Sequence, residues 1–393
     1  MINKGLNALT RTATSQPKAL KAETATKALP PLPTVTTSPR RTFANATSPR
    51  ARQNPNIVAV QGATGTQGMS LTLAAVRGGK RYGTPVKAVV NDPAKFMNSA
   101  VIDDGSTLTN LATQERVSVT TQAAELPPED TLFINATSAS GLGPTVSALP
   151  RRAVVLATQN GLDPGTGDRK DIDLHYGIST IVSGGDAKTG YTVNKGGKLQ
   201  VGADYPHLSS LLDIFKNDDQ DIFSVEVVKD IRAAKYEKVA LNSALNATCT
   251  LLGMRLGQLR QLMRSDVRYE KLVGRIAAEV LDVARARDVA VQPTDAVLAH
   301  IDKVMGANEG HPTSMQNSFL KGEALETAVL NGGIGKQGRE VGVSTPMNDL
   351  MAKTLDQFVA IRDVDGASNF QATHAQLMED TREMLLDAAV RLN

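Results

Sequence analysis

Three glycines, Gly62, Gly65 and Gly68, are spaced as in a turn that binds phosphate. They follow a short apolar run and precede Met69–Val76, where apolar residues recur at helical spacing. A strand, a glycine-rich turn and a helix in this order bring a pyrophosphate to a helix N-terminus, and glycines let the backbone approach it. We predict a dinucleotide site here, with a purely structural turn as the alternative. The residues assigned to cofactor binding are Gly62, Gly65, Thr66, Gln67 and Gly68.

A lysine and two asparagines are spaced for one face of a helix. Lys238, Asn242 and Asn246 stand at positions i, i+4 and i+8 in a mostly apolar stretch. A polar side chain buried there without a partner would cost on the order of 1–3 kcal/mol. Either the row faces a ligand, or Lys238 reaches solvent while the asparagines bond neighbouring loops.

Two more candidate positions follow predicted strands. Val86–Val90 ends at Asn91 and Asp92, where an acid would hold the ribose of NAD and an arginine would favour NADP; this pair leaves both open. The strand at residues 153–156 runs into Gln159-Asn160-Gly161, at the end of a strand where α/β sheets bind ligands. Asn-Gly is equally a good turn dipeptide.

Two kinds of structure must position these residues. Apolar runs predict parallel strands, and alternation between about residues 177 and 202 predicts antiparallel strands added to them. Helical periods dominate from about residue 224, and Val225–Gly253 predicts one long helix or two abutting ones. The predicted fold class is therefore α/β, with a Rossmann-type dinucleotide-binding domain at residues 56–224 and an all-helical domain at residues 225–393.

Composition excludes several classes of protein. The single cysteine, Cys249, excludes a disulfide framework and a multi-cysteine zinc site, and the five histidines show no H-x-x-x-H spacing, so we expect no metal. No apolar run of about 18 residues exists to span a membrane. We expect a soluble protein in a reducing compartment, the cytoplasm.

Residues 1–55 have a different composition from the rest. They hold nine Lys+Arg against one acid, which leaves 34 basic and 39 acidic residues, a net charge of −5, in residues 56–393. That balance argues against nucleic acid as a partner. The tail lacks any apolar period and is predicted to be disordered. It fits an organellar transit peptide, a type III export signal of a bacterial effector, or a plain extension.

Four segments together resemble the ketopantoate reductase (2-dehydropantoate 2-reductase) family, across about residues 57–365. They are similar to its Q-N-G-L/M turn, its K-x-x-x-N-x-x-x-N-P-x-T helix, its S-S-M…T-E-I-D…N-G segment and its G-x-x-x-P-x-N turn. Their order and spacing match. In chain order the segments are Gln159–Leu162, Lys238–Thr248, Thr313–Gly332 and Gly342–Asn348.

The resemblance implies NAD(P)H-dependent reduction of a small 2-keto acid, in the first place ketopantoate to pantoate, a step of pantothenate biosynthesis. Lys238 would give a proton to the substrate carbonyl, because hydride attack on a ketone builds an alkoxide that a positioned lysine can neutralise. Glu326 would hold this ammonium and the substrate. Asn160 would lie near the nicotinamide. The residues implied to bind the 2-keto acid are Asn242, Asn246 and Ser314.

The sequence also departs from the family pattern, mostly in the cofactor half. The loop between the outer glycines is one residue longer than G-x-G-x-x-G, Asn91 stands in place of an arginine, and Thr137 in place of a lysine. The resemblance implies NADPH, with NADH not excluded, and a helical domain like the C-terminal domain of 6-phosphogluconate dehydrogenase. A dinucleotide-binding module that has lost catalysis, acting as an exported effector on a partner, is the alternative. A homodimer is left open.

Overall fold

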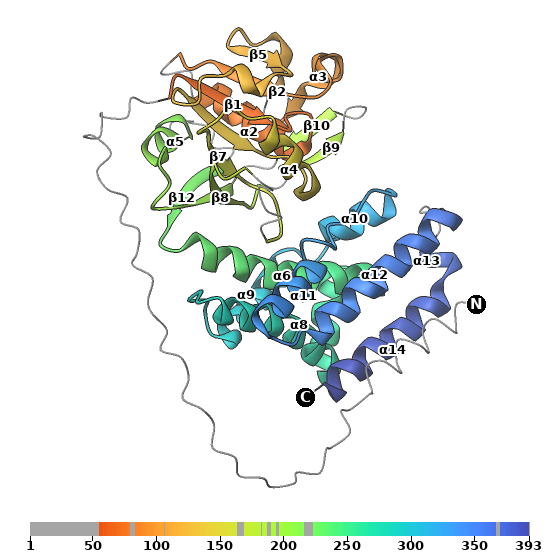
Figure 1. Ribbon diagram of the computed structural model, residues 1–393. Coiled ribbons are helices and arrows are strands. Elements are labelled where there is room, and N and C mark those ends of the chain that lie inside the picture. Colours follow the sequence, from red (N-terminus) through yellow and green to blue (C-terminus); the bar gives the residue numbers. More distant parts are fainter. Residues whose placement is uncertain are drawn as a thin grey trace, which may run out of the picture. The chain divides into compact units, whose positions relative to one another are not determined.

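The computed structural model describes residues 55–78, 83–105, 107–162, 169–181, 183–186, 190–193, 196–215, 223–366 and 370–392 (Figure 1). Within it, Asn54–Asn393 form one compact unit. The predictions for the basic tail fall on residues outside the described part, apart from Pro55.

The larger sheet combines parallel and antiparallel pairing. Its strands are β1 (Ile57–Gln61), β2 (Val86–Val89), β5 (Val117–Thr120), β6 (Thr131–Asn135), β7 (Val154–Ala157), β8 (Asp173–Ser179), β11 (Gly197–Gly202) and β12 (Phe223–Val228). They lie in the order β12-β11-β8-β7-β6-β1-β2-β5. The strands from β8 to β5 are parallel, while β11 runs antiparallel to β8 and parallel to β12. The C-terminal ends of the parallel strands therefore meet at one edge.

Both faces of this sheet are covered by an apolar core. Alternate residues of a strand point to opposite sides, so each strand contributes to both cores. Val58 and Val60 of β1 join one apolar core, and Ala59 between them joins the other. The first core includes α2 (Thr66–Gly78), α3 (Pro93–Ser99) and α5 (Leu208–Phe215), and the second includes α4 (Ala139–Ser147). Short 3-10 turns, η2 (Leu111–Thr113) and η3 (Ala123–Glu125), complete the connections.

A second, smaller sheet packs against α2. It contains β3 (Val101–Asp103), β4 (Leu108–Asn110), β9 (Ser183–Asp186) and β10 (Gly190–Val193), in the order β4-β3-β10-β9. The hydroxyl of Tyr191 on β10 donates to the carbonyl of Thr64 over 2.6 Å, which ties this sheet to the glycine turn after β1.

The C-terminal half is helical and is organised around one central helix, α6 (Ile231–Leu252). Asp230 caps its first turn by accepting from two backbone N–H groups, and Gly253 ends it at φ 62°. The other helices are α7 (Leu256–Ser265), α8 (Val267–Ala286), α9 (Thr294–Ala307), α10 (Ser314–Leu320), α11 (Asn331–Val341), α12 (Pro346–Asp365), α13 (Phe370–Thr373) and α14 (Ala375–Arg391). Of these, α8, α10, α12 and α14 pack against α6 (Figure 1).

The fold class is confirmed, one local prediction is wrong, and another holds only in part. The predicted helix from Val225 begins only at Ile231, because residues 223–228 pair with β11 as a strand that buries Phe223. Between residues 177 and 202 the prediction of antiparallel strands added to the sheet holds for β11, but β8 joins the sheet in parallel and β9 and β10 join the smaller sheet. Pairing over long distances decided both outcomes, and local alternation does not report it.

Candidate functional site

The predicted cofactor residues lie at the C-terminal edge of the parallel strands. The glycine turn follows β1, Asn91 follows β2 by two residues, and Asn160 follows β7 by three. Parallel strands present these ends side by side, so residues that are 98 positions apart in sequence, from Gly62 to Asn160, belong to one edge.

The glycine turn is shaped by close backbone contacts. Gly62 adopts φ +76°, and a Cβ there would lie 2.9 Å from the methyl group of Thr137. A Cβ on Gly68 would lie 2.1 Å from the carbonyl oxygen of Gly62, so only glycine lets α2 begin against the turn. Gly65 is exposed, and its Cβ would meet nothing closer than 3.5 Å. Helix α2 starts at Thr66, and the first N–H groups of a helix have no partner within it. Glycine is thus required at two positions where the turn packs closely, while the turn is open on its outer side at Gly65.

Buried amides connect the ends of three neighbouring strands. Asn135, at the end of β6 and fully buried, donates to the side chain of Gln61 over 3.0 Å. Its amide oxygen accepts from the side chain of Gln159 over 2.6 Å and from the hydroxyl of Thr137 over 2.7 Å. Thr137, which aligns with a lysine of the family pattern, thus donates its hydroxyl to a side chain at the end of β6. These bonds fix the turn that carries Asn160, and only the assembled sheet revealed them.

The end of β2 is polar and open to solvent. Asn91 is exposed, and its side chain makes no hydrogen bond to any other described residue. Asp92 caps α3 by accepting from the backbone N–H of Lys95 over 3.1 Å. Capping accounts for the acid at this position.

Helix α6 brings Lys238 to the end of β8. The Lys238 ammonium donates to the backbone carbonyl of Ser179, the last residue of β8, over 2.7 Å. An ammonium has three donors, so this bond leaves two. The alternative in which Lys238 reaches into bulk solvent is not what the structure shows, since the side chain is half-buried and bound to the sheet edge.

Glu326 approaches the same region from the segment between α10 and α11. Its carboxylate accepts from the side-chain amide of Asn160 over 3.2 Å. Gly161 makes this approach close: it adopts φ +81°, and a Cβ there would lie 2.6 Å from the carbonyl of Val329. The structure therefore brings together Asn160 and Glu326, which lie 166 positions apart in sequence.

Glu326 was expected to hold the Lys238 ammonium. Among the described residues the two form no salt bridge, so they interact through their charges and not by direct contact. Burial lowers the pKa of Lys238 to about 8, and the charge of Glu326 opposes that shift. Burial raises the pKa of Glu326, opposed by the hydrogen bond from Asn160 and by the charges of Lys238 and Lys235. The group that holds the carboxylate by a hydrogen bond is Asn160.

The residues implied to bind substrate differ in exposure. Asn242 is half-buried and Asn246 is buried, and neither side chain hydrogen-bonds another described residue. Ser314 begins α10, which packs against α6, and is exposed. The asparagine amides are therefore available to a ligand, and the alternative in which they bond neighbouring loops finds no support among the described contacts.

Lys235 is a residue that sequence reasoning missed. It lies one turn before Lys238 on α6, and its ammonium donates to the backbone carbonyl of Gln159 over 3.1 Å. The only available signal was its spacing, i−3 from Lys238, which continues the polar row on the same helix face.

Two asparagines of the family-like motifs serve the fold. Asn331, at the start of α11, donates to the side chain of Asn348 over 3.0 Å. Asn348 donates in turn to Glu279 over 2.8 Å and to the carbonyl of Ile276 over 3.1 Å. Glu279 also accepts from the backbone of Met347, and burial raises its pKa. This network joins α8, α11 and α12.

We expect Asn348→Ala to lower the free energy of unfolding by roughly 2–3 kcal/mol, because it leaves Asn331 and the Glu279 carboxylate short of buried partners. Urea unfolding of the full chain measures this value. Asn308→Ala is the control, since Asn308 is half-buried and donates to one carbonyl, that of Val304. Losses of equal size in both variants would contradict the role given to the network.

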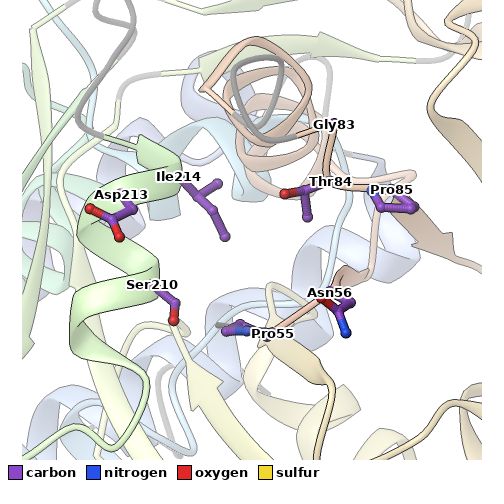
Figure 2. Close-up of a pocket in the computed structure, with 8 residues that line it drawn as sticks. All are labelled: Pro55, Asn56, Gly83, Thr84, Pro85, Ser210, Asp213 and Ile214. Carbon is purple, nitrogen blue, oxygen red and sulfur yellow. The ribbon is translucent and has the colours of Figure 1, made fainter. Parts of the chain in front are cut away.

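Two hollows lie away from this edge. One, of about 330 Å³, is lined by Asn56 before β1, Thr84 before β2 and Asp213 of α5, which places it at the opposite ends of the strands (Figure 2). The other, of about 800 Å³, lies between α2 and the segment from Thr107 to Arg116. In the described part of the chain, no His, Cys, Asp and Glu side chains gather in threes to hold a metal. No helix there is long and apolar enough to cross a membrane.

Comparison with known proteins finds similarity in sequence and in fold. Residues 230–359 match the family model described as ketopantoate reductase PanE/ApbA C terminal. A 2-dehydropantoate 2-reductase of Pyrobaculum aerophilum is 31% identical over 126 residues, 32% of this chain and 42% of that protein. The aligned part of the chain thus spans less than half the length of this relative.

Solved structures show the same fold along most of the chain. The structure of 2-dehydropantoate 2-reductase from Geobacter metallireducens GS-15 superposes with a TM-score of 0.63 at 21% identity, covering 77% of this chain and 99% of that one. D-mandelate dehydrogenase, in a ternary structure with NADH and anilino(oxo)acetate, superposes with a TM-score of 0.62 at 18% identity, covering 77% and 97%. The helical domain is therefore similar in sequence to the C-terminal domain of ketopantoate reductases, and the chain shares its fold with solved 2-dehydropantoate 2-reductases.

Proposed function

We propose that this protein is an NAD(P)H-dependent reductase of a small 2-keto acid, with ketopantoate as the first candidate substrate. One observation carries the proposal: Lys238 of α6 and Glu326 of the segment before α11 meet the strand ends at Ser179 and Asn160. A proton donor, a carboxylate and a candidate dinucleotide turn thereby share one edge of the sheet.

The cofactor is proposed to be a nicotinamide dinucleotide, with NADPH preferred on the family resemblance. The glycine turn supports this, because Gly68 lets α2 start against it and Gly65 leaves its outer side open. The residues that would hold the dinucleotide are Gly62, Gly65, Thr66, Gln67 and Gly68, with Asn91 at the ribose and Asn160 near the nicotinamide. The Asp92 carboxylate accepts from the backbone N–H of Lys95 at the cap of α3, a bond that the fold alone explains.

In the proposed mechanism the chain supplies the proton and the orientation. The bound dinucleotide supplies the hydride. Lys238 holds its ammonium at the carbonyl oxygen of the substrate and transfers a proton as negative charge develops there. Its bond to Ser179 fixes the direction of the side chain and leaves two N–H groups for the substrate. Glu326, held by Asn160, keeps the lysine charged despite its burial.

Asn242, Asn246 and Ser314 are proposed to bind the 2-keto acid. The two asparagines follow Lys238 on one face of α6 and bring amide donors without other described partners. Ser314 is proposed to approach the site from the start of α10, a helix that packs against α6. Amides and a hydroxyl are suited to the carboxylate and carbonyl oxygens of such a substrate.

The direct experiment mixes the full chain with NADPH or NADH and follows the fluorescence of the nicotinamide, then adds ketopantoate and follows absorbance. We expect binding of both dinucleotides, tighter for NADPH, and oxidation on addition of the keto acid. Binding without oxidation by any 2-keto acid would favour the binding module. A preference of about tenfold for NADH, ~1.4 kcal/mol, would overturn the choice of NADPH.

The pH dependence follows from the lowered pKa of Lys238. A general acid works in its protonated form, so kcat/KM for reduction should fall as pH rises through about 8, well below the ordinary lysine value of 10.5. Because the Glu326 charge raises this pKa, Glu326→Gln should move the alkaline limb to lower pH. A pH profile of kcat/KM for the parent and this variant measures both; a limb near 10.5 would contradict the assignment.

A further inference from the structure

Lys235 occupies an unusual position for a lysine. Its side chain is 8% exposed, its ammonium donates to the carbonyl of Gln159 over 3.1 Å, and it lies 4.9 Å from the ring centroid of Tyr176 on β8. Burying an ammonium is costly unless it is bound and paired. An apolar residue of similar size would be buried there at a lower cost in desolvation free energy. We therefore ask what the charge of Lys235 does.

Its acceptor belongs to the turn that carries Asn160. The side chain of Gln159 is bound to Asn135 at the end of β6, and its carbonyl is bound to Lys235 on α6. The turn is thus held from the sheet on one side and from the helix on the other. The next residue, Asn160, is the hydrogen-bond donor to Glu326.

We propose that Lys235 is a positioning residue: it fixes the turn 159–161 against α6 and thereby sets Asn160 and Glu326, and it presents a second positive charge to that carboxylate. The effect of Lys235 on catalysis rests on the proposed function. The effect of Lys235 on the position and charge of Glu326 does not rest on it, and can be tested without measuring turnover.

The charges that face Glu326 define the expected effect. Lys238 and Lys235 approach from α6, and Asn160 approaches from the turn after β7. Both lysines lower the pKa of Glu326 against the effect of burial. Removing Lys235 should therefore raise the pKa of Glu326 in two ways. The positive charge is lost, and the hydrogen bond from Asn160 is weakened because the turn is less firmly held.

The experiment labels the glutamate carboxyl carbons of the full chain with ¹³C and follows their NMR shifts with pH. The Glu326 signal is identified by its absence in Glu326→Gln. We compare the parent with Lys235→Met, with Lys235→Arg, which keeps the charge, and with Lys353→Met, which removes an exposed lysine of α12. The Glu326 titration should move to higher pH in Lys235→Met, and stay near the parent's in Lys235→Arg and Lys353→Met.

Kinetics form the second arm. If the parent reduces a 2-keto acid, Lys235→Met should raise KM by about tenfold, ~1.4 kcal/mol, with a smaller change in kcat. A parent without reductase activity would refute the proposed function, while the titration would still decide on Lys235. If Lys235→Met does not fold, Lys235→Gln, which keeps a donor but no charge, is titrated instead. An unmoved Glu326 titration, or failure of both variants to fold, would overturn the inference.

Discussion

Replacing Lys238 with alanine should lower kcat for reduction of a 2-keto acid by roughly 10²–10⁴-fold, the usual contribution of a positioned general acid. Dinucleotide affinity should stay within about twofold, because the side chain contacts the end of β8 and not the glycine turn. Lys353→Ala, on an exposed face of α12, is the matched control and should behave as the parent. Steady-state kinetics and NADPH fluorescence titrations measure the two quantities.

Variants of Glu326 distinguish a catalytic role of Lys238 from a structural one. Glu326→Ala leaves Asn160 without its acceptor and should mainly raise KM, with a smaller loss of kcat. The double variant should lose far less than the sum of the two single losses, since the side chains act on one proton and one substrate. A purely structural role predicts instead that both variants lose thermal stability and that activity follows the folded fraction. A fully folded Lys238→Ala protein with parental kcat would show that the proposed mechanism is wrong.

The second large effect is expected at the glycine turn, where two substitutions should separate binding from folding. Gly65→Val should weaken dinucleotide binding by about 100-fold or more, ~2.7 kcal/mol, and leave thermal stability nearly unchanged. Gly65 is exposed and a Cβ there meets only a carbonyl at 3.5 Å, so a branched side chain fits the protein and occupies the space of the pyrophosphate.

Gly68→Ala should lose both properties. Its Cβ would lie 2.1 Å from the carbonyl oxygen of Gly62, so the turn or the start of α2 must move. Gly310→Val, where a Cβ meets nothing within 4 Å, is the control for adding a branched side chain. Isothermal calorimetry with NADPH and NADH, together with thermal unfolding, reads all three variants. Parental affinity in Gly65→Val would show that the turn serves only the fold.

The sequence alone determined the class of fold and the identity of the main candidates. Local patterns were sufficient where a single element decides the outcome: the turn from Gly62 to Gly68 does lie between a strand and a helix, and Lys238, Asn242 and Asn246 do share one face of α6. Helical periodicity and glycine spacing are properties of contiguous residues, so they can be read without the rest of the chain.

Only the tertiary structure decided which groups meet. Residues 223–228 pair with β11 as a strand, although a helix was predicted from Val225 onward. The bond between Asn160 and Glu326 spans 166 positions, and that between Lys235 and Gln159 spans 76. Such contacts depend on how α6 and the segment before α11 pack against the strand ends, and packing is set by side chains from every element at once. For that reason the sequence named Lys238 and Glu326, whereas the structure supplied Ser179, Asn160 and Lys235 as their surroundings.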